Sequence, residues 1–152
     1  AIKKGITVIG TGDFTHPAWF EELKEKLVPS DENGLYKLAK DTHQLPQCLQ
    51  TDVYFIPSAE VSCIYSKGGK VRKIHLVVIF EKLEEVALFN TRLSNIGNLT
   101  ADGRPIVGID AKLLLQMVLD VSEKGIVIPA HVWTPHFSLF GAFSGFDSLK
   151  EC

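Results

Sequence analysis

Apolar residues recur along the chain with the spacings expected of strands and of amphipathic helices. Short apolar runs rich in β-branched residues predict strands at residues 6–9, 53–56, 61–65, 71–80 and 126–128. The segment Lys67-Gly68-Gly69-Lys70 predicts that the third and fourth of these strands form a hairpin. We expect the first and the last strand to be buried.

Three other stretches have helical spacing. The first predicted helix begins at Pro17, which suits the first turn, and its apolar face extends to Leu27. The apolar stripe from Leu83 to Leu93 predicts a second helix. A third begins after Asp110, whose side chain is a suitable N-cap, and ends at Gly125. Polar segments rich in turn residues are expected to be loops, at residues 29–50 and 95–108.

Strands that alternate with helices favour an α/β fold with a largely parallel sheet, either open or closed into a barrel. A length of 152 residues, with 45% hydrophobic and 22% charged residues, suits one globular domain. Residues 1–4 have the pattern of a helix end, and residues 146–151 that of a helix start. We therefore expect residues 1–152 to be a fragment of one longer domain.

Charge and cysteine content narrow the functional classes. The formal net charge is −2, so any contact with nucleic acid has to rest on a local patch. No apolar run approaches the roughly 18–20 residues that cross a bilayer, and no signal-peptide pattern opens the chain. The three cysteines lack metal-ligand spacing, which favours a reducing, cytoplasmic setting over a disulfide framework: Cys48, Cys63 and Cys152.

Four ionisable residues lie beside or within the predicted strands. Asp13 follows the first strand, Glu60 the second and His131 the last, whereas His75 interrupts an apolar strand. Reactive side chains of α/β proteins collect beyond the carboxyl ends of strands, so we expect all four in one cleft. Two imidazoles and two carboxylates suit Zn²⁺, Mn²⁺ or Fe²⁺, and such ions activate water and clamp phosphate oxygens.

Each of these residues also has an ordinary structural interpretation. A histidine within a strand, such as His75, is more often a hydrogen-bonded core residue than a ligand. Asp13 also suits a turn and Glu60 a solvated strand end. His131, next to Trp133, also suits packing or capping. Residue types and spacing alone leave these alternatives open.

Taken together, these segments resemble the PHP family of metal-dependent phosphoesterases, which is related to histidinol phosphatase. Residues 56–62 and 71–78 resemble the family's strand-end glutamate, the short hairpin and the histidine of the next apolar strand. Residues 125–131 resemble its later strand, which ends in Ala-His. The resemblance implies part of a PHP-type distorted (β/α)7 barrel that, in the full-length protein, holds two or three divalent metal ions, zinc or manganese.

The resemblance also implies which residues bind the metals. The implied ligands are Asp13, Glu60, His75 and His131. Thr11-Gly12-Asp13 stands where family members usually carry Thr-Asp-His, so Asp13 would replace a histidine, and His16 is the alternative ligand there. No catalytic residue is implied beyond the metal ligands.

Three segments are similar to the endonuclease Q branch of the family, whose members nick DNA next to deaminated bases. They are residues 12–17, 97–105 and 129–135. The similarity implies a DNA-repair endonuclease whose partner is damaged duplex DNA. It also directs attention to three candidate substrate-binding residues, which are Asn98, Arg104 and Trp133. Arg104 would hold a phosphate with its planar fork, or lie exposed in a turn. Trp133 would stack on a base, or pack in the core or at the rim.

Two motifs of the family are missing from their usual places. Family members open with His-x-His on the first strand and close with Asp-x-His on a late strand, and neither occurs there in this chain. We therefore expect residues 1–152 to be the central part of a PHP-like domain that holds only part of the metal shell and is inactive by itself. A phosphate-binding Gly-x-x-x-x-Gly-Lys-Ser/Thr motif is also absent, which argues against an NTPase.

Two alternative functions stay open at this point. The near-neutral charge favours a PHP phosphatase that acts on a small phosphomonoester. A non-catalytic PHP-like module would keep the fold without the chemistry. The polar loop at residues 97–105 favours the nuclease. The sequence gives no prediction of oligomeric state.

Overall fold

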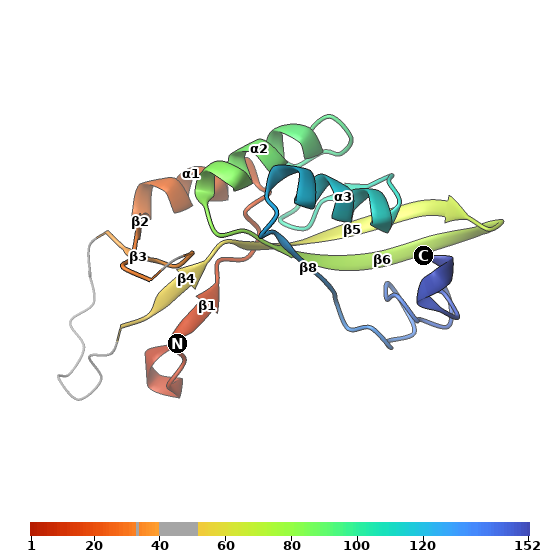
Figure 1. Ribbon diagram of the computed structural model, residues 1–152, viewed down its shortest axis with the longest axis horizontal. Coiled ribbons are helices and arrows are strands. Elements are labelled where there is room, and N and C mark those ends of the chain that lie inside the picture. Colours follow the sequence, from red (N-terminus) through yellow and green to blue (C-terminus); the bar gives the residue numbers. More distant parts are fainter. Residues whose placement is uncertain (33, 40–51) are drawn as a thin grey trace.

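A computed structural model describes residues 1–32, 34–39 and 52–152, which form two four-stranded sheets and several helices (Figure 1). The elements in chain order are η1 (Ile2–Lys4), β1 (Val8–Gly10), α1 (Pro17–Lys26), β2 (Leu27–Pro29), β3 (Tyr36–Leu38), β4 (Tyr54–Ile56), β5 (Ser58–Lys67), β6 (Lys70–Ile79), α2 (Leu83–Leu93), β7 (Ile106–Val107), α3 (Ala111–Val121), β8 (Ile126–Pro129) and η3 (Leu149–Glu151). Part of the predicted loop at 29–50, and Cys48 within it, lies outside the described residues.

Both sheets are mixed, so the prediction of a largely parallel sheet is wrong. Their strand orders are β1-β4-β3-β2 and β7-β5-β6-β8. Among the described strands, β1 pairs with β4 and β5 with β7 in parallel, and the other pairs are antiparallel. The long β5–β6 hairpin is the main reason. Its turn uses Gly68 and Gly69 at φ of +62° and +74°, the left-handed conformation that a two-residue hairpin turn requires.

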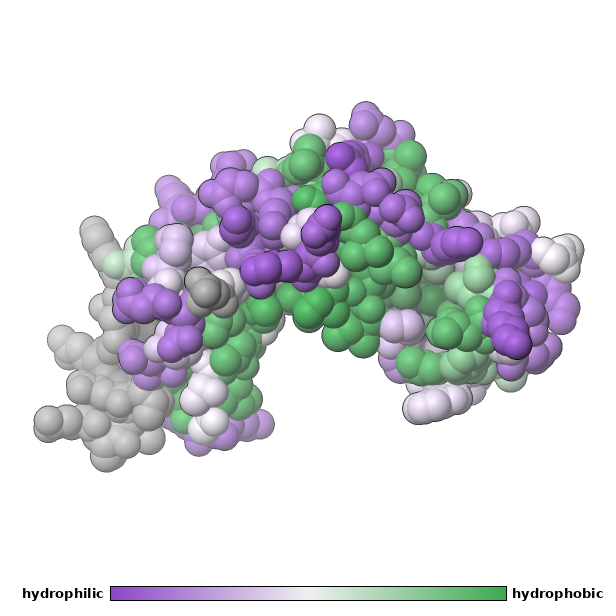
Figure 2. Space-filling model, in the orientation of Figure 1, coloured by the Kyte–Doolittle hydropathy of each residue, from purple (hydrophilic) through white to green (hydrophobic). Residues whose placement is uncertain are grey.

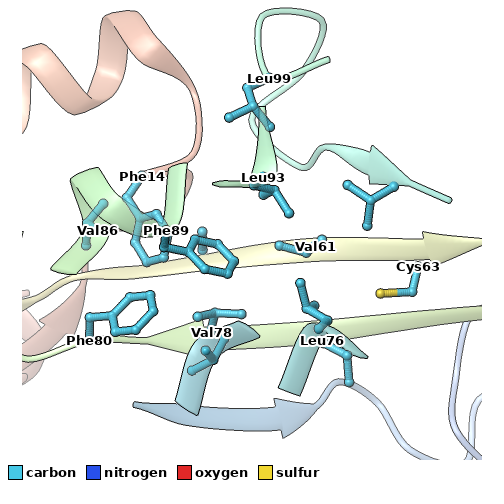
Figure 3. Packing of buried hydrophobic residues seen from close by; sticks show 14 of the residues in the cluster. Phe14, Val61, Cys63, Leu76, Val78, Phe80, Val86, Phe89, Leu93 and Leu99 are labelled. Carbon is cyan, nitrogen blue, oxygen red and sulfur yellow. The ribbon is translucent and has the colours of Figure 1, made fainter. Parts of the chain in front are cut away.

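One face of the β7-β5-β6-β8 sheet carries the core. Alternate residues of β5 and β6 point to this face and are buried, namely Ala59, Val61, Cys63, Ile74, Leu76 and Val78. Helices α2 and α3 cover it (Figures 1 and 3) and contribute Val86 and Phe89, and Leu114 and Val118, respectively. Each such side chain contributes about 1.5–3 kcal/mol when fully buried. The predicted helices are confirmed, including the Asp110 N-cap, which accepts a hydrogen bond from the Lys112 amide at 2.9 Å. Helix α3 ends at Val121, before Gly125.

The loop after β1 is anchored to this core by an aromatic cluster. Phe14 is fully buried, and its ring lies 6.0 Å from that of Phe80 and 6.1 Å from that of Phe89 (Figure 3). Asn90 donates a hydrogen bond to the Phe14 carbonyl at 2.8 Å. Thr15 donates to the carbonyl of Gly103 at 3.0 Å, which ties this loop to the polar loop before β7. The two loops are therefore held side by side.

The opposite face of this sheet lacks a helical cover among the described residues. The underside of the molecule is hollowed, and hydrophobic residues gather there over β8 (Figure 2). Ile128 in β8 is 47% exposed, and Val8 in β1 is 45% exposed. The predictions that the first and last strands are buried are therefore wrong, because each is an edge strand. No helix in the described part of the chain is long and apolar enough to cross a membrane.

The segment after β8 continues along the same edge of β6 with which β8 pairs. The His75 amide of β6 donates to the Phe137 carbonyl at 2.9 Å, and the Ala130 amide donates to the His75 carbonyl at 2.9 Å. Farther along, buried Arg72 lies 4.1 Å from the centre of the Phe146 ring and donates to the Gly145 carbonyl. This segment therefore brings residues 130–137 against the middle of β6.

Candidate metal centre

Glu60 and His75 share one face of the β5–β6 hairpin. Ser62 pairs with His75 and Glu60 with Val77, so the Glu60 and His75 side chains both project from the face that the helices leave open. We expected these residues beyond the carboxyl ends of parallel strands. That prediction is wrong, because Glu60 lies near the start of β5 and His75 in the middle of antiparallel β6.

His131 reaches the same place from the segment after β8. Its backbone has a φ of +32°, a left-handed conformation that is costly for a residue other than glycine. The Thr134 hydroxyl lies 2.7 Å from His131 Nδ1, which leaves Nε2 directed toward His75. A hydrogen bond to one ring nitrogen is the usual way in which proteins orient a ligating histidine.

The three candidate ligand atoms face one another. Glu60 Oε1 lies 2.9 Å from His75 Nδ1, which lies 3.2 Å from His131 Nε2, and all three lie within 4.8 Å of one another. Neighbouring ligands around a tetrahedral zinc ion with bonds of about 2.0 Å are about 3.3 Å apart. Two imidazole nitrogens and one carboxylate oxygen at these separations fit a divalent ion of the zinc or manganese class.

His75 is the most enclosed of the three residues. It is only 7% exposed, and the ring of Phe137 stacks on its imidazole with the ring centres 4.7 Å apart. Burial lowers the pKa of His75 below its ordinary value. The Glu60 carboxylate opposes this shift, and Arg104 and His131 add to it. The imidazole is therefore neutral at neutral pH, which is the form that binds metal ions.

Asp13 and His16 do not join this group of three. A side-chain carbon added at Gly103 would lie 2.5 Å from Asp13 Cγ, so the Asp13 carboxyl packs against the polar loop before β7. Asp13 has a φ of +47°, which fits the turn interpretation. His16 is the N-cap residue of α1, and its carbonyl accepts a hydrogen bond from the Phe20 amide at 2.9 Å. A ligand role for either residue stays a prediction.

Two of the predicted substrate-binding residues lie beside the group of three. Arg104 Nη1 donates to Glu60 Oε1 at 3.2 Å. Arg104 and Asn98 line a pocket of about 350 Å³ together with His75 and Phe137. The Asn98 side-chain oxygen accepts hydrogen bonds from the Thr100 amide and hydroxyl, so this oxygen shapes the loop. Only the Asn98 amide nitrogen is left to serve a ligand.

Trp133 is 82% exposed, so the alternative that it packs against the core is wrong. Sequence reasoning also missed three residues of the site. Thr134 orients His131, Phe137 stacks on His75, and Ser62 lines the pocket with a buried hydroxyl that lacks a partner among the described residues. The strand alternation that places Ser62 on the same face as Glu60 was a usable signal, whereas the Phe137 contact depends on the path of the chain after β8.

Comparison with protein-family models gives no match. Among curated proteins, an uncharacterised protein of Methanocaldococcus jannaschii is 31% identical to this chain over 134 residues. That alignment includes 87% of the chain but only 13% of the relative, so the chain spans about an eighth of that protein's length. This relative therefore brings no function with it.

Two solved structures have the same fold. The lesion-specific endonuclease PfuEndoQ from Pyrococcus furiosus matches 98% of the chain, with a TM-score of 0.70 and 24% identity. A complex of endonuclease Q with a 27-mer duplex that has an abasic lesion at the active site matches 97%, with a TM-score of 0.71 and 26% identity. The chain spans 32% and 31% of these proteins, respectively. The predicted resemblance to endonuclease Q is thus confirmed at the level of the fold.

Proposed function

We propose that this chain carries part of the metal centre of a metal-dependent phosphodiesterase that nicks DNA at deaminated or otherwise damaged bases. The main support is the convergence of Glu60, His75 and His131 next to Arg104 and a pocket. The fold shared with endonuclease Q, one structure of which contains a lesion-bearing duplex, adds to this support. We further propose that residues 1–152 are the central part of a PHP-type distorted barrel.

Each residue of the site has a separate task in this proposal. Glu60, His75 and His131 hold a divalent ion, zinc or manganese, whose chemistry is to activate water and to stabilise charge on a phosphate oxygen. Thr134 fixes the ring orientation of His131, and Phe137 holds that of His75. The complete domain would hold two or three ions in total, so the additional ions would need ligands beyond these three residues. Asp13 and His16 are the candidates for such ligands in this chain.

The substrate side of the site is supplied by the loop before β7 and the segment after β8. Arg104 offers a planar cation that suits a phosphate group of the DNA backbone. Trp133 offers an exposed aromatic surface on which an unpaired base can stack. The Asn98 amide nitrogen adds a donor at the pocket. These contacts are local, as the net charge of −2 requires.

A second candidate function is a phosphatase that acts on a small phosphomonoester. The low net charge and the modest pocket volume of about 350 Å³ favour it. The two functions differ in the substrate that is cleaved, since a phosphatase releases inorganic phosphate from a small ester and leaves an internal phosphodiester intact.

The decisive assay uses the longest gene product that contains residues 1–152. Duplexes with a single hypoxanthine, uracil or abasic site are incubated with added Zn²⁺ or Mn²⁺, and p-nitrophenyl phosphate is tested in parallel. We expect nicking beside the lesion, loss of nicking with a chelator, and little phosphatase activity. Phosphatase activity without nicking would favour the second candidate, and neither activity in a folded, metal-loaded protein would favour a non-catalytic module.

A further inference from the structure

Arg104 occupies the carboxylate oxygen that a metal ion would use. Its Nη1 lies 3.2 Å from Glu60 Oε1, the same oxygen that lies 2.9 Å from His75 Nδ1. A guanidinium keeps its positive charge at physiological pH. A divalent cation bound to this oxygen would therefore face a second cation within a few ångströms, in a partly buried site where charges are weakly screened.

The side chain of Arg104 is free to leave, although its backbone is fixed. The Arg104 amide donates to Asp102 Oδ1 at 3.0 Å, and the neighbouring Gly103 carbonyl is held by Thr15. The Arg104 side chain is 48% exposed, and among the described residues its guanidinium forms an ion pair with Glu60. It also borders the pocket. A rotation about its own side-chain bonds would take it from Glu60 to the pocket without moving the loop.

We propose that Arg104 is an exchangeable counter-ion, which neutralises Glu60 in the metal-free site and is released toward the pocket when a metal ion binds. Once released, the guanidinium is available to a phosphate group of the substrate. This inference rests on the proposed metal centre. In addition to the proposed function, it states that metal binding frees Arg104 to bind phosphate. Metal and substrate would then bind cooperatively.

The opposite arrangement makes the opposite prediction. If Arg104 stays on Glu60 while Glu60 holds the metal, it acts as an outer support of a ligand, and its removal weakens metal binding, about 10- to 100-fold in typical cases. If Arg104 competes with the metal, its removal strengthens metal binding. An exposed ion pair of this kind is worth up to about a fivefold change in affinity. The sign of the change thus separates the two arrangements.

The first test measures zinc affinity by competition with a chromophoric chelator. The proteins are the wild type, Arg104→Gln, Lys73→Gln and Glu60→Gln. Lys73 is the matched control, because it is a cation on the same sheet face that lies over Phe137 and has no recorded contact with Glu60. We expect Arg104→Gln to bind zinc about three- to fivefold more tightly than wild type, and Lys73→Gln to stay within about twofold.

A decrease or no change in the zinc affinity of Arg104→Gln would overturn the inference, and so would an equal increase in Lys73→Gln. Failure of the metal centre itself is distinguishable. If wild type and Glu60→Gln bind zinc equally, or neither binds it, the proposed ligand set is wrong. The proposed release of Arg104 by metal binding is then also wrong.

The second test measures the release. Binding of an abasic duplex with a phosphorothioate at the scissile position is measured with and without zinc. We expect Arg104→Gln to lower the duplex affinity several-fold with zinc and by less than about twofold without zinc, since the guanidinium is then held by Glu60. An equal loss under both conditions would show that Arg104 is always available and would overturn its release. A wild type that binds no duplex would overturn both the DNA proposal and the phosphate role of Arg104.

Discussion

His75 holds a central position among the candidate ligands, since it contacts Glu60, His131 and Phe137 at once. A buried imidazole that is stacked on one side and hydrogen-bonded on another keeps a single rotamer. Its Nδ1 atom therefore points to the place where the other two ligand atoms meet. Such preorganisation lowers the cost of metal binding, because little side-chain freedom is lost when the ion arrives.

Glu60→Gln tests the carboxylate with almost no change in shape. We expect zinc affinity to fall by at least about a hundredfold and nicking to be abolished, because the amide removes the charge that the ion needs. The thermal midpoint should stay within a few degrees, since the side chain is partly exposed and lies outside the core. We expect the same losses of zinc affinity and nicking, with a similar thermal midpoint, for His131→Ala. Glu81→Gln, which removes a partly exposed carboxylate paired with Lys124, is the control. Variants that unfold while their folded fraction keeps full activity would show that Glu60 and His131 are structural.

Thr134→Val tests the orientation of His131. The substitution keeps the shape of the side chain and removes the hydroxyl that lies 2.7 Å from His131 Nδ1. We expect zinc affinity to fall about tenfold, the usual effect of removing a partner that orients a ligand. Thr91→Val, which removes an exposed hydroxyl bonded to the Ala87 carbonyl, should leave it unchanged. Equal affinities in both variants would mean that the hydroxyl does not orient the ring.

The buried thiol of Cys63 predicts a pH dependence of stability. Burial, with a smaller contribution from Asp110, raises its pKa from 9.0 to about 12. The thiol ionises first in the unfolded chain, so its contribution to stability is complete below pH 9 and is lost as the pH rises toward 12. At pH 10.5 this loss is about 2 kcal/mol, at 1.36 kcal/mol per pH unit. Urea unfolding at pH 8 and 10.5 should show a smaller decrease in Cys63→Ala than in wild type. An identical decrease would refute the assignment.

At the level of elements, local signals in the sequence were sufficient for the helices and for the long hairpin. Pro17, the Asp110 cap and the Gly68-Gly69 turn act through neighbouring residues, and the structure confirms all three. The mixed sheets were beyond such signals, because strand direction and order depend on contacts between distant segments. The wrong predictions that β1 and β8 are buried have the same cause. Both strands lie at sheet edges, and an apolar run in the sequence does not reveal an edge position.

The candidate metal centre, like the fold, could be predicted only in part from the sequence. Glu60, His75 and His131 were selected from residue type and resemblance, and the structure brings them together. Asp13 was selected in the same way, yet its carboxyl packs against Gly103. The difference arises because the Phe14 anchor and the positive φ of Asp13 set its direction, and neither can be derived from spacing.

The segment after β8 depends on close packing of its glycines. A side-chain carbon at Gly145 would lie 2.3 Å from the Gly141 amide nitrogen, whereas one at Gly108 would meet no atom within 4 Å. We therefore expect Gly145→Ala to destabilise the protein by about 1–3 kcal/mol and to weaken zinc binding, because this segment also positions His131 and Phe137. Gly108→Ala is the matched control and should be nearly neutral. The comparison needs urea unfolding and zinc titration, and equal stabilities of the two variants would contradict the packing.

At the scale of the whole molecule, helices cover one face of the β7-β5-β6-β8 sheet (Figure 1). The strand register places Glu60 and His75 of the candidate metal centre on the other face. The hydrophobic core on the helical side carries the stability, so substitutions on the open side can change chemistry with little effect on folding. This separation explains why a catalytic role can be tested here with point variants.

The most direct test of the account is the position of bound metal. Crystals of the chain grown with zinc are measured on both sides of the zinc absorption edge. We predict an anomalous peak about 2.0–2.3 Å from Glu60 Oε1, His75 Nδ1 and His131 Nε2, with water or buffer in any remaining position and Arg104 turned away from Glu60. A peak elsewhere, or no peak while Glu60 Oε1 and His75 Nδ1 keep their present separation of 2.9 Å, would contradict the proposed metal centre.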